Sequence, residues 1–217
     1  MRREKKTFEK KTKENKFFNF SAGSYRWGSP NATCIGQLSW SEAFHIPLTH
    51  MLGSAGTNTF SWTIQQFATQ VSILAQTLAE ILAQVNTFFE ENCLPSSCYI
   101  RLNRYPPCPL ASGLMPHTDS AFLTILHQDQ VRGLQMLKDG KWFAVKPNPD
   151  ALIIIIGDLF QAWSNGVYKS VEHRVVTNPK LERFSMAYFF CPSDATVKCQ
   201  MPVSVTGLAY YLGLKSP

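Results

Sequence analysis

The feature that most constrains this chain is a change of periodicity near residue 98. Beyond it, short segments rich in β-branched and aromatic residues alternate with turns that contain Pro, Gly or Asp. Such a series favours an antiparallel sandwich, barrel or jelly roll. Asp139-Gly140 and Asn165-Gly166 are typical of hairpin turns. The expected strands are Tyr99–Arg104, Phe122–His127, Leu134–Met136, Trp142–Val145, Leu152–Ile156, Val171–Val176 and Ser185–Phe190.

A long helix is expected before this series, over residues 62–89. Apolar side chains recur there with a spacing of three and four positions, from Ile64 through Val71 and Leu78 to Phe89. This spacing places them in one stripe along a helix, and the stripe carries no charge. We therefore expect the helix to pack on the sheet as part of the core.

The basic character of the chain is confined to its start. Residues 1–16 hold eight Lys or Arg against three Glu, so they account for five of the six net positive charges. A nucleic-acid groove needs charge spread over a folded face, so nucleic-acid binding ranks last among the functions considered. We expect a basic start over residues 1–20, a helical and loop part over 21–97, a jelly-roll domain over 98–200 and an atypical tail over 201–217.

The cysteines and the hydropathy indicate the compartment. Six cysteines are scattered without a CxxC pair, which argues against a disulfide framework or a zinc ribbon. No stretch of eighteen apolar residues exists and no apolar segment follows the first basic residues. The sequence therefore predicts a cytoplasmic protein, with the nucleus as a second location, and no membrane partner.

A candidate metal site begins with His117-Thr118-Asp119. Side chains two positions apart on a strand project to the same side, so this His and this carboxylate can hold one metal ion. Two His and one carboxylate on one face of an octahedral iron leave positions open for O₂ and a chelating cosubstrate. A third ligand must come from elsewhere in the chain. The candidates are His45, His50, His127 and His173.

A candidate carboxylate receptor lies ten positions after His173. Arg183 and Ser185 share one face of an expected strand, and a guanidinium fork beside a hydroxyl suits a carboxylate. In isolation Arg183 would be read as half of a surface ion pair. The order of HxD, His and RxS within a strand-rich chain is more specific than any one of these parts.

These motifs together resemble the plant 2-oxoglutarate- and Fe(II)-dependent dioxygenases. Residues 103–109 (Asn-Arg-Tyr-Pro-Pro-Cys-Pro) resemble the N-x-Y-P-x-C-P signature of that family, and residues 113–119 resemble its metal loop. Gly133-Leu134-Gln135, Gly157-Asp158 and residues 165–175 follow in the family's order. The resemblance implies a double-stranded β-helix, which is a jelly roll of the cupin type, with a long supporting helix.

The resemblance also implies roles for individual residues. His117, Asp119 and His173 would bind Fe(II). Arg183 and Ser185 would hold the distal carboxylate of 2-oxoglutarate, with Tyr105 and Asn103 beside the same cosubstrate. O₂ would be the second cosubstrate, and ascorbate would support activity.

Within the family, the likeness is to gibberellin 2-oxidases, especially the group that acts on C20 gibberellins. Residues 24–28, 39–46, 122–130 and 158–165 carry it. The implied reaction is 2β-hydroxylation, which inactivates the hormone, and the implied substrate is a diterpenoid acid. Such a substrate needs an apolar pocket with a cationic or polar end. Tyr25, Arg26 and Trp27 are the candidates for substrate binding.

Two departures from the family pattern leave other functions open. The chain begins after the upstream part that the family usually carries, and residues 201–217 lack the charged closing helix, so we expect truncation at both ends. The alternatives are a related dioxygenase that acts on a flavonoid or another specialised metabolite, and an inactive jelly-roll module.

Overall fold

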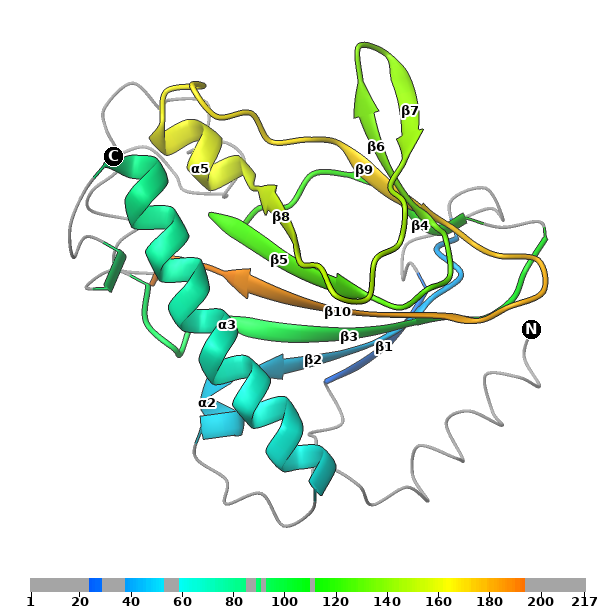
Figure 1. Ribbon diagram of the computed structural model, residues 1–217, viewed down its shortest axis with the longest axis horizontal. Coiled ribbons are helices and arrows are strands. Elements are labelled where there is room, and N and C mark those ends of the chain that lie inside the picture. Colours follow the sequence, from blue (N-terminus) through cyan, green and yellow to red (C-terminus); the bar gives the residue numbers. More distant parts are fainter. Residues whose placement is uncertain are drawn as a thin grey trace, which may run out of the picture.

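The computed structural model describes residues 24–28, 38–52, 59–84, 89–90, 93–109 and 112–193. The expected basic start and the atypical tail lie outside these residues. Two antiparallel sheets face each other, as in a jelly roll, and the expected fold class is confirmed (Figure 1). Among the described residues, no helix is long and apolar enough to cross a membrane.

The larger sheet has six strands in the order β1-β2-β3-β10-β5-β8. The smaller has four, in the order β4-β9-β6-β7. The strands of the larger sheet are β1 (Tyr25–Trp27), β2 (Glu42–Pro47), β3 (Tyr99–Tyr105), β5 (Leu123–Gln128), β8 (Ile153–Ile156) and β10 (Arg183–Phe190). Those of the smaller are β4 (Ser112–His117), β6 (Leu134–Lys138), β7 (Lys141–Ala144) and β9 (His173–Val176).

Strand alternation gives the larger sheet two different faces. In β3, Ile100 lies opposite Tyr188 of β10, and both are buried in the main core. Arg101 and Asn103 of β3 project to the other face, toward the smaller sheet, because successive residues of a strand point to opposite sides. The side chains between the two sheets are therefore more polar than those under the helix.

The long helix α3 (Thr59–Ala83) covers the outer face of the larger sheet, where it contacts β5 and β10 (Figure 1). Ala68, Val71, Ala75 and Ala79 form its buried stripe. The helix was expected to reach residue 89, but it ends at Ala83, because Gln84 adopts a positive φ of 56° that breaks the helical backbone.

Five elements were not expected from the sequence. The sequence analysis placed only helix and loop in residues 21–97, yet β1 and β2 extend the larger sheet beside β3. Strand β4 was missed, and two register irregularities interrupt its pairing with β9. The short helices α2 (Leu48–Leu52) and α5 (Asp158–Trp163) were missed too.

The hairpin turn expected at Asn165-Gly166 is wrong. Both residues have positive φ, 51° and 78°, but they follow helix α5 instead of joining two strands. The Gly166 N–H donates to the carbonyl oxygen of Gln161 at 2.7 Å, as at the C-terminal end of many helices. A left-handed conformation suits both a hairpin turn and a helix end, so the dipeptide alone does not separate them.

Gly157, between β8 and α5, is a position where only glycine fits. A Cβ there would lie 1.9 Å from the carbonyl oxygen of Ala121 and 3.0 Å from that of Asp119. We expect Gly157→Ala to lower the free energy of unfolding by about 2–3 kcal/mol, because backbone atoms cannot yield as a flexible side chain does. Urea unfolding measures this. Gly140→Ala meets no atom within 4 Å and costs only the backbone strain of a side chain at a φ of 72°, so a loss for Gly157→Ala no larger than for Gly140→Ala would contradict the packing argument.

Candidate active site

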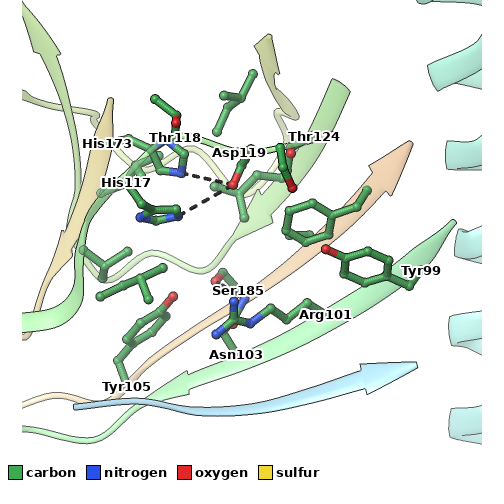
Figure 2. A pocket seen from close by; sticks show the side chains of 18 of the residues that line it. Tyr99, Arg101, Asn103, Tyr105, His117, Thr118, Asp119, Thr124, His173 and Ser185 are labelled. Atoms are coloured by element: carbon green, nitrogen blue, oxygen red, sulfur yellow. Dashed lines mark hydrogen bonds and ion pairs between the residues drawn. The ribbon is translucent and has the colours of Figure 1, made fainter. Parts of the chain in front are cut away.

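His117, Asp119 and His173 converge between the two sheets (Figure 2). His117 ends β4 and lies directly opposite His173, which begins β9. The Nε2 atoms of His117 and His173 are 3.6 and 3.8 Å from Oδ1 of Asp119. The three ligand atoms lie within 4.8 Å of one another. Of the four histidines that the sequence left open as third ligand, His173 is therefore the one beside the HxD pair.

The local backbone differs from the expected one. Asp119 lies beyond the end of β4, so it does not share a continuous strand with His117. Its position is set instead by the start of α5, where the Asp158 N–H donates to the carbonyl oxygen of Asp119 at 2.7 Å. The Thr118 hydroxyl donates to the Asp158 carboxylate at 2.9 Å. Asp158 thus fastens the loop that carries Asp119.

Both histidines are held in the tautomer that a metal ligand needs. Nδ1 of His117 donates to the carbonyl oxygen of Met115 at 2.8 Å, and Nδ1 of His173 donates to that of Val171 at 3.1 Å. With the proton on Nδ1, each Nε2 presents a lone pair toward Asp119. Burial, reinforced by the nearby His173, lowers the pKa of His117 and favours its neutral form. The set fits a divalent transition metal such as Fe(II).

The triad opens into a cavity of about 210 Å³ that also receives Arg183, Ser185, Asn103 and Tyr105. Register explains this convergence, because Arg183 lies opposite Tyr105 and Ser185 lies opposite Asn103 on the neighbouring strand. The structure thus brings together all seven residues that the sequence analysis assigned to the metal and to the cosubstrate.

Arg183 is a buried cation without an anion. It is 1% exposed, and no described carboxylate forms an ion pair with it. One Nη donates to Oε1 of Gln128 at 2.8 Å and the other to the Ser185 hydroxyl at 3.4 Å, while Nε has no partner. Burial lowers the pKa of Arg183, which reflects the cost of a desolvated charge.

Further polar groups around Arg183 also lack a partner. Oδ1 of Asn103 and Nε2 of Gln128 are buried without a hydrogen bond among the described residues. The Arg183 guanidinium lies 5.1 Å from the ring centroid of Tyr105. Buried donors are normally satisfied, so the open Nε of Arg183 and Nε2 of Gln128 fit a ligand with carboxylate oxygens such as 2-oxoglutarate. Oδ1 of Asn103 can only accept, so a carboxylate does not satisfy it.

The second HxD, His127 and Asp129, lies apart from the triad. Nε2 of His127 contacts the carbonyl oxygen of Pro149 at 2.9 Å. The Asp129 carboxylate accepts hydrogen bonds from the N–H groups of Val131 and Phe184. These contacts give this pair a structural role.

The structure does not bring the three expected substrate residues into the cavity lining. Tyr25 packs on Phe44, with ring centroids 5.3 Å apart, and Trp27 packs on Trp40 at 5.1 Å. By register, Arg26 shares the face of the larger sheet that points to the smaller one, and its side chain is exposed. Their role in substrate binding stays a prediction.

Sequence reasoning missed Tyr99, Arg101 and Thr124 of the cavity lining, and Gln128, which accepts a hydrogen bond from Arg183. All four are on strands of the larger sheet. The signal that identifies Tyr99 and Arg101 is the alternation of β3, because both share the face of Asn103 and Tyr105.

His45 on β2 predicts a pH dependence of stability. Its ring stacks on Tyr99 at 5.1 Å, and its Nε2 is buried without a partner among the described residues. Burial, reinforced by the charges of Arg101 and Arg26, lowers the pKa of His45 from 6.5 to about 4. The unfolded chain therefore binds more protons between these two values, and stability falls as the pH falls through this window.

We expect a loss of about 1–2 kcal/mol from this group, which is less than the full linkage value because the ring is partly exposed. Urea unfolding at about pH 7 and about pH 5 measures it, with His45→Phe as the variant that keeps the stack. The variant should lose less stability than the parent on acidification. Equal losses would show that His45 titrates as it does in the unfolded chain.

Comparison with known proteins agrees with this geometry. The sequence model of the 2OG-Fe(II) oxygenase superfamily matches residues 96–192, which contain the triad and the Arg183 pocket. The solved structure of dioxygenase for auxin oxidation 1 from Arabidopsis thaliana, a binary complex with 2-oxoglutarate, is 30% identical, with a TM-score of 0.65. The match covers 83% of this chain and 71% of that one. This chain belongs to the 2OG-Fe(II) oxygenase superfamily.

The curated relatives of this oxygenase chain include gibberellin enzymes. It is 64% identical over 200 residues to gibberellin 2-beta-dioxygenase 8 of Arabidopsis thaliana, covering 88% of this chain and 58% of the relative. It is 51% identical over 189 residues to gibberellin 2-beta-dioxygenase 6 of Oryza sativa subsp. japonica, covering 79% and 53%. The chain thus spans somewhat more than half the length of these relatives.

Proposed function

We propose that this oxygenase chain carries the catalytic site of a gibberellin 2-beta-dioxygenase. The observation that carries the proposal is one cavity that holds a His-Asp-His set and, opposite it, a buried arginine without an anion. The identity of 64% and 51% to two gibberellin 2-beta-dioxygenases supports the substrate class. A cytoplasmic or nuclear location and support by ascorbate belong to the same proposal.

In this proposal His117, Asp119 and His173 hold Fe(II), and Arg183 with Ser185 holds the distal carboxylate of 2-oxoglutarate. When bound, the two supply the oxidation: O₂ and 2-oxoglutarate are consumed, succinate and CO₂ leave, and one oxygen atom enters a C–H bond of the substrate. Asn103 and Tyr105 complete the cosubstrate end. The residues of the chain position these groups and do not take part as acid or base.

Burial supports this division of roles. Asp119 and His173 are 6% and 5% exposed, so their lone pairs are kept from bulk water. Apolar side chains of both sheets line the remainder of the cavity, where they keep it dry and leave room for hydrocarbon. They are Leu114, Leu126, Leu134, Ile155, Val175, Ala187 and Phe189.

The experiment is succinate release with Fe(II), ascorbate and 2-oxoglutarate across a panel of C20 and C19 gibberellins, with the hydroxylated position read by mass spectrometry. The proposal expects succinate in step with a 2β-hydroxylated product. A flavonoid and an alkaloid in the same panel test the related-dioxygenase alternative. Binding of 2-oxoglutarate without turnover of any gibberellin would reject the substrate class.

A further inference from the structure

Arg101 is a second cation in the cavity that the proposed mechanism does not use. It lines the cavity from β3, and its Nε is buried without a hydrogen-bond partner. No described carboxylate forms an ion pair with it. Figure 2 shows its side chain directed into the cavity, between Tyr99 and Asn103. Arg101 is half-buried, and a cation that no carboxylate of the cavity balances favours an anionic ligand.

The neighbours of Arg101 leave space in front of it. Ala187 lies opposite it on β10, and this small side chain leaves the strand face beside the guanidinium open. His45 lies opposite it on β2 and offers no negative charge. Next along the same face, Tyr99 stacks between His45 and Phe189, with centroids 5.1 and 4.6 Å away. The cation therefore lies at the edge of a flat aromatic wall.

The charges in the cavity, counted with Fe(II) and 2-oxoglutarate bound, leave one positive charge without a negative partner. Its charged lining residues are Arg101, Arg183 and Asp119. A bound Fe(II) and a dianionic 2-oxoglutarate cancel each other, and Asp119 offsets one of the two arginines. The distal carboxylate of the cosubstrate has its own receptor in Arg183 and Ser185. One positive charge remains, and it is on the residue beside the aromatic wall.

We infer that Arg101 binds a carboxylate of the organic substrate, so that the cavity selects an apolar ring compound that bears a carboxylate. The inference rests on the proposed function, because it assumes that Fe(II) and 2-oxoglutarate occupy the triad and the Arg183 end. Arg101 is then a specificity-determining residue. The hydrocarbon lies along Tyr99 and Phe189.

The test is calorimetric binding to the anaerobic Fe(II)–2-oxoglutarate form of the protein, so it needs no turnover. The probes are a C20 gibberellin, other polycyclic carboxylic acids, and the methyl ester of each. For the parent we expect the acid to bind more tightly than its ester. Arg101→Met should weaken binding of the acid by about 30-fold or more and leave the ester within about 3-fold. Arg132→Met, which removes an exposed arginine from a loop, should change neither.

Stability and cosubstrate binding separate this role from a structural one. Arg101→Met removes a half-buried cation that has no ion pair with a described carboxylate, so its Tm should equal or exceed that of the parent. Its affinity for 2-oxoglutarate should be unchanged. Arg101→Lys should keep part of the preference for the acid. A lowered Tm together with equal losses for acid and ester would overturn the inference, as would a weakened affinity for 2-oxoglutarate.

The same panel distinguishes failure of the inference from failure of the proposed function. If the parent binds another polycyclic acid through Arg101 but no gibberellin, the substrate of the proposed function is wrong and the role of Arg101 stands. If gibberellin acid binds the parent and Arg101→Met equally well, the role of Arg101 is wrong. A parent that binds none of the acids more tightly than its ester overturns the inference.

Discussion

Asp119→Ala is expected to abolish turnover and to weaken Fe(II) binding by more than about 100-fold, because loss of a supporting contact to a metal ligand alone costs 10–100-fold. Asp119 is the only carboxylate of the triad and lies within 3.8 Å of both histidine Nε2 atoms. Among the described residues, no other set of three His, Cys, Asp or Glu could hold a metal ion. His117→Ala and His173→Ala should behave in the same way.

The measurement is the rise in Tm that anaerobic Fe(II) produces, since a ligand that binds only the folded state stabilises it. The variants should lose most of that rise. His127→Ala is the matched control, because His127 belongs to the second HxD and its Nε2 contacts the carbonyl oxygen of Pro149, away from the triad. A full rise in Tm for Asp119→Ala, or loss of the rise for His127→Ala, would show that Fe(II) binds at His127 and Asp129 instead.

Arg183→Lys is expected to weaken 2-oxoglutarate binding by about 2–4 kcal/mol while Fe(II) binding stays near normal. Lysine keeps the charge but loses the planar fork that can hold a carboxylate through two parallel hydrogen bonds. The site is also shaped around arginine, since a Cβ on Gly133 would lie 2.9 Å from Cδ of Arg183.

Ser185→Ala should cost less, about 1 kcal/mol, as is usual for one neutral hydrogen bond. Calorimetric titration of 2-oxoglutarate into the anaerobic Fe(II) protein measures both variants. The critical result is that Arg183→Lys should lose more affinity for 2-oxoglutarate than Ser185→Ala. Equal affinity of Arg183→Lys and the parent would place the receptor for the distal carboxylate elsewhere in the chain.

Apart from β4, the strands from Tyr99 onward could be predicted because their alternation and their turns are local signals. Strands β1, β2 and β4 could not. β1 has three residues, and β2 carries Glu42 and His45, whose burial is a consequence of the finished sheet. β4 contains Pro116 and an irregular register, which mask its pattern.

The residues of the site also differ in how well the sequence predicts them. The metal and cosubstrate residues could be predicted because the motifs that carry them keep their order along the chain. Arg101 was missed, since an arginine in a strand is typical of a solvated face. Its alternation with Asn103 and Tyr105 is the available signal, and the pairing of β3 with β10 places that face beside Ser185 and Arg183.

The proposed roles of the triad, Arg183 and Ser185 require that Fe(II) and 2-oxoglutarate bind together in one cavity between the two sheets. Anaerobic titration of 2-oxoglutarate into the Fe(II)-loaded chain, followed by the visible metal-to-ligand charge-transfer absorption, tests this directly. We predict that this absorption band appears and saturates at one equivalent of 2-oxoglutarate. We expect no band in His173→Ala. A chain that binds Fe(II) and 2-oxoglutarate without producing the band would contradict these roles, because the cosubstrate would then lie away from the metal.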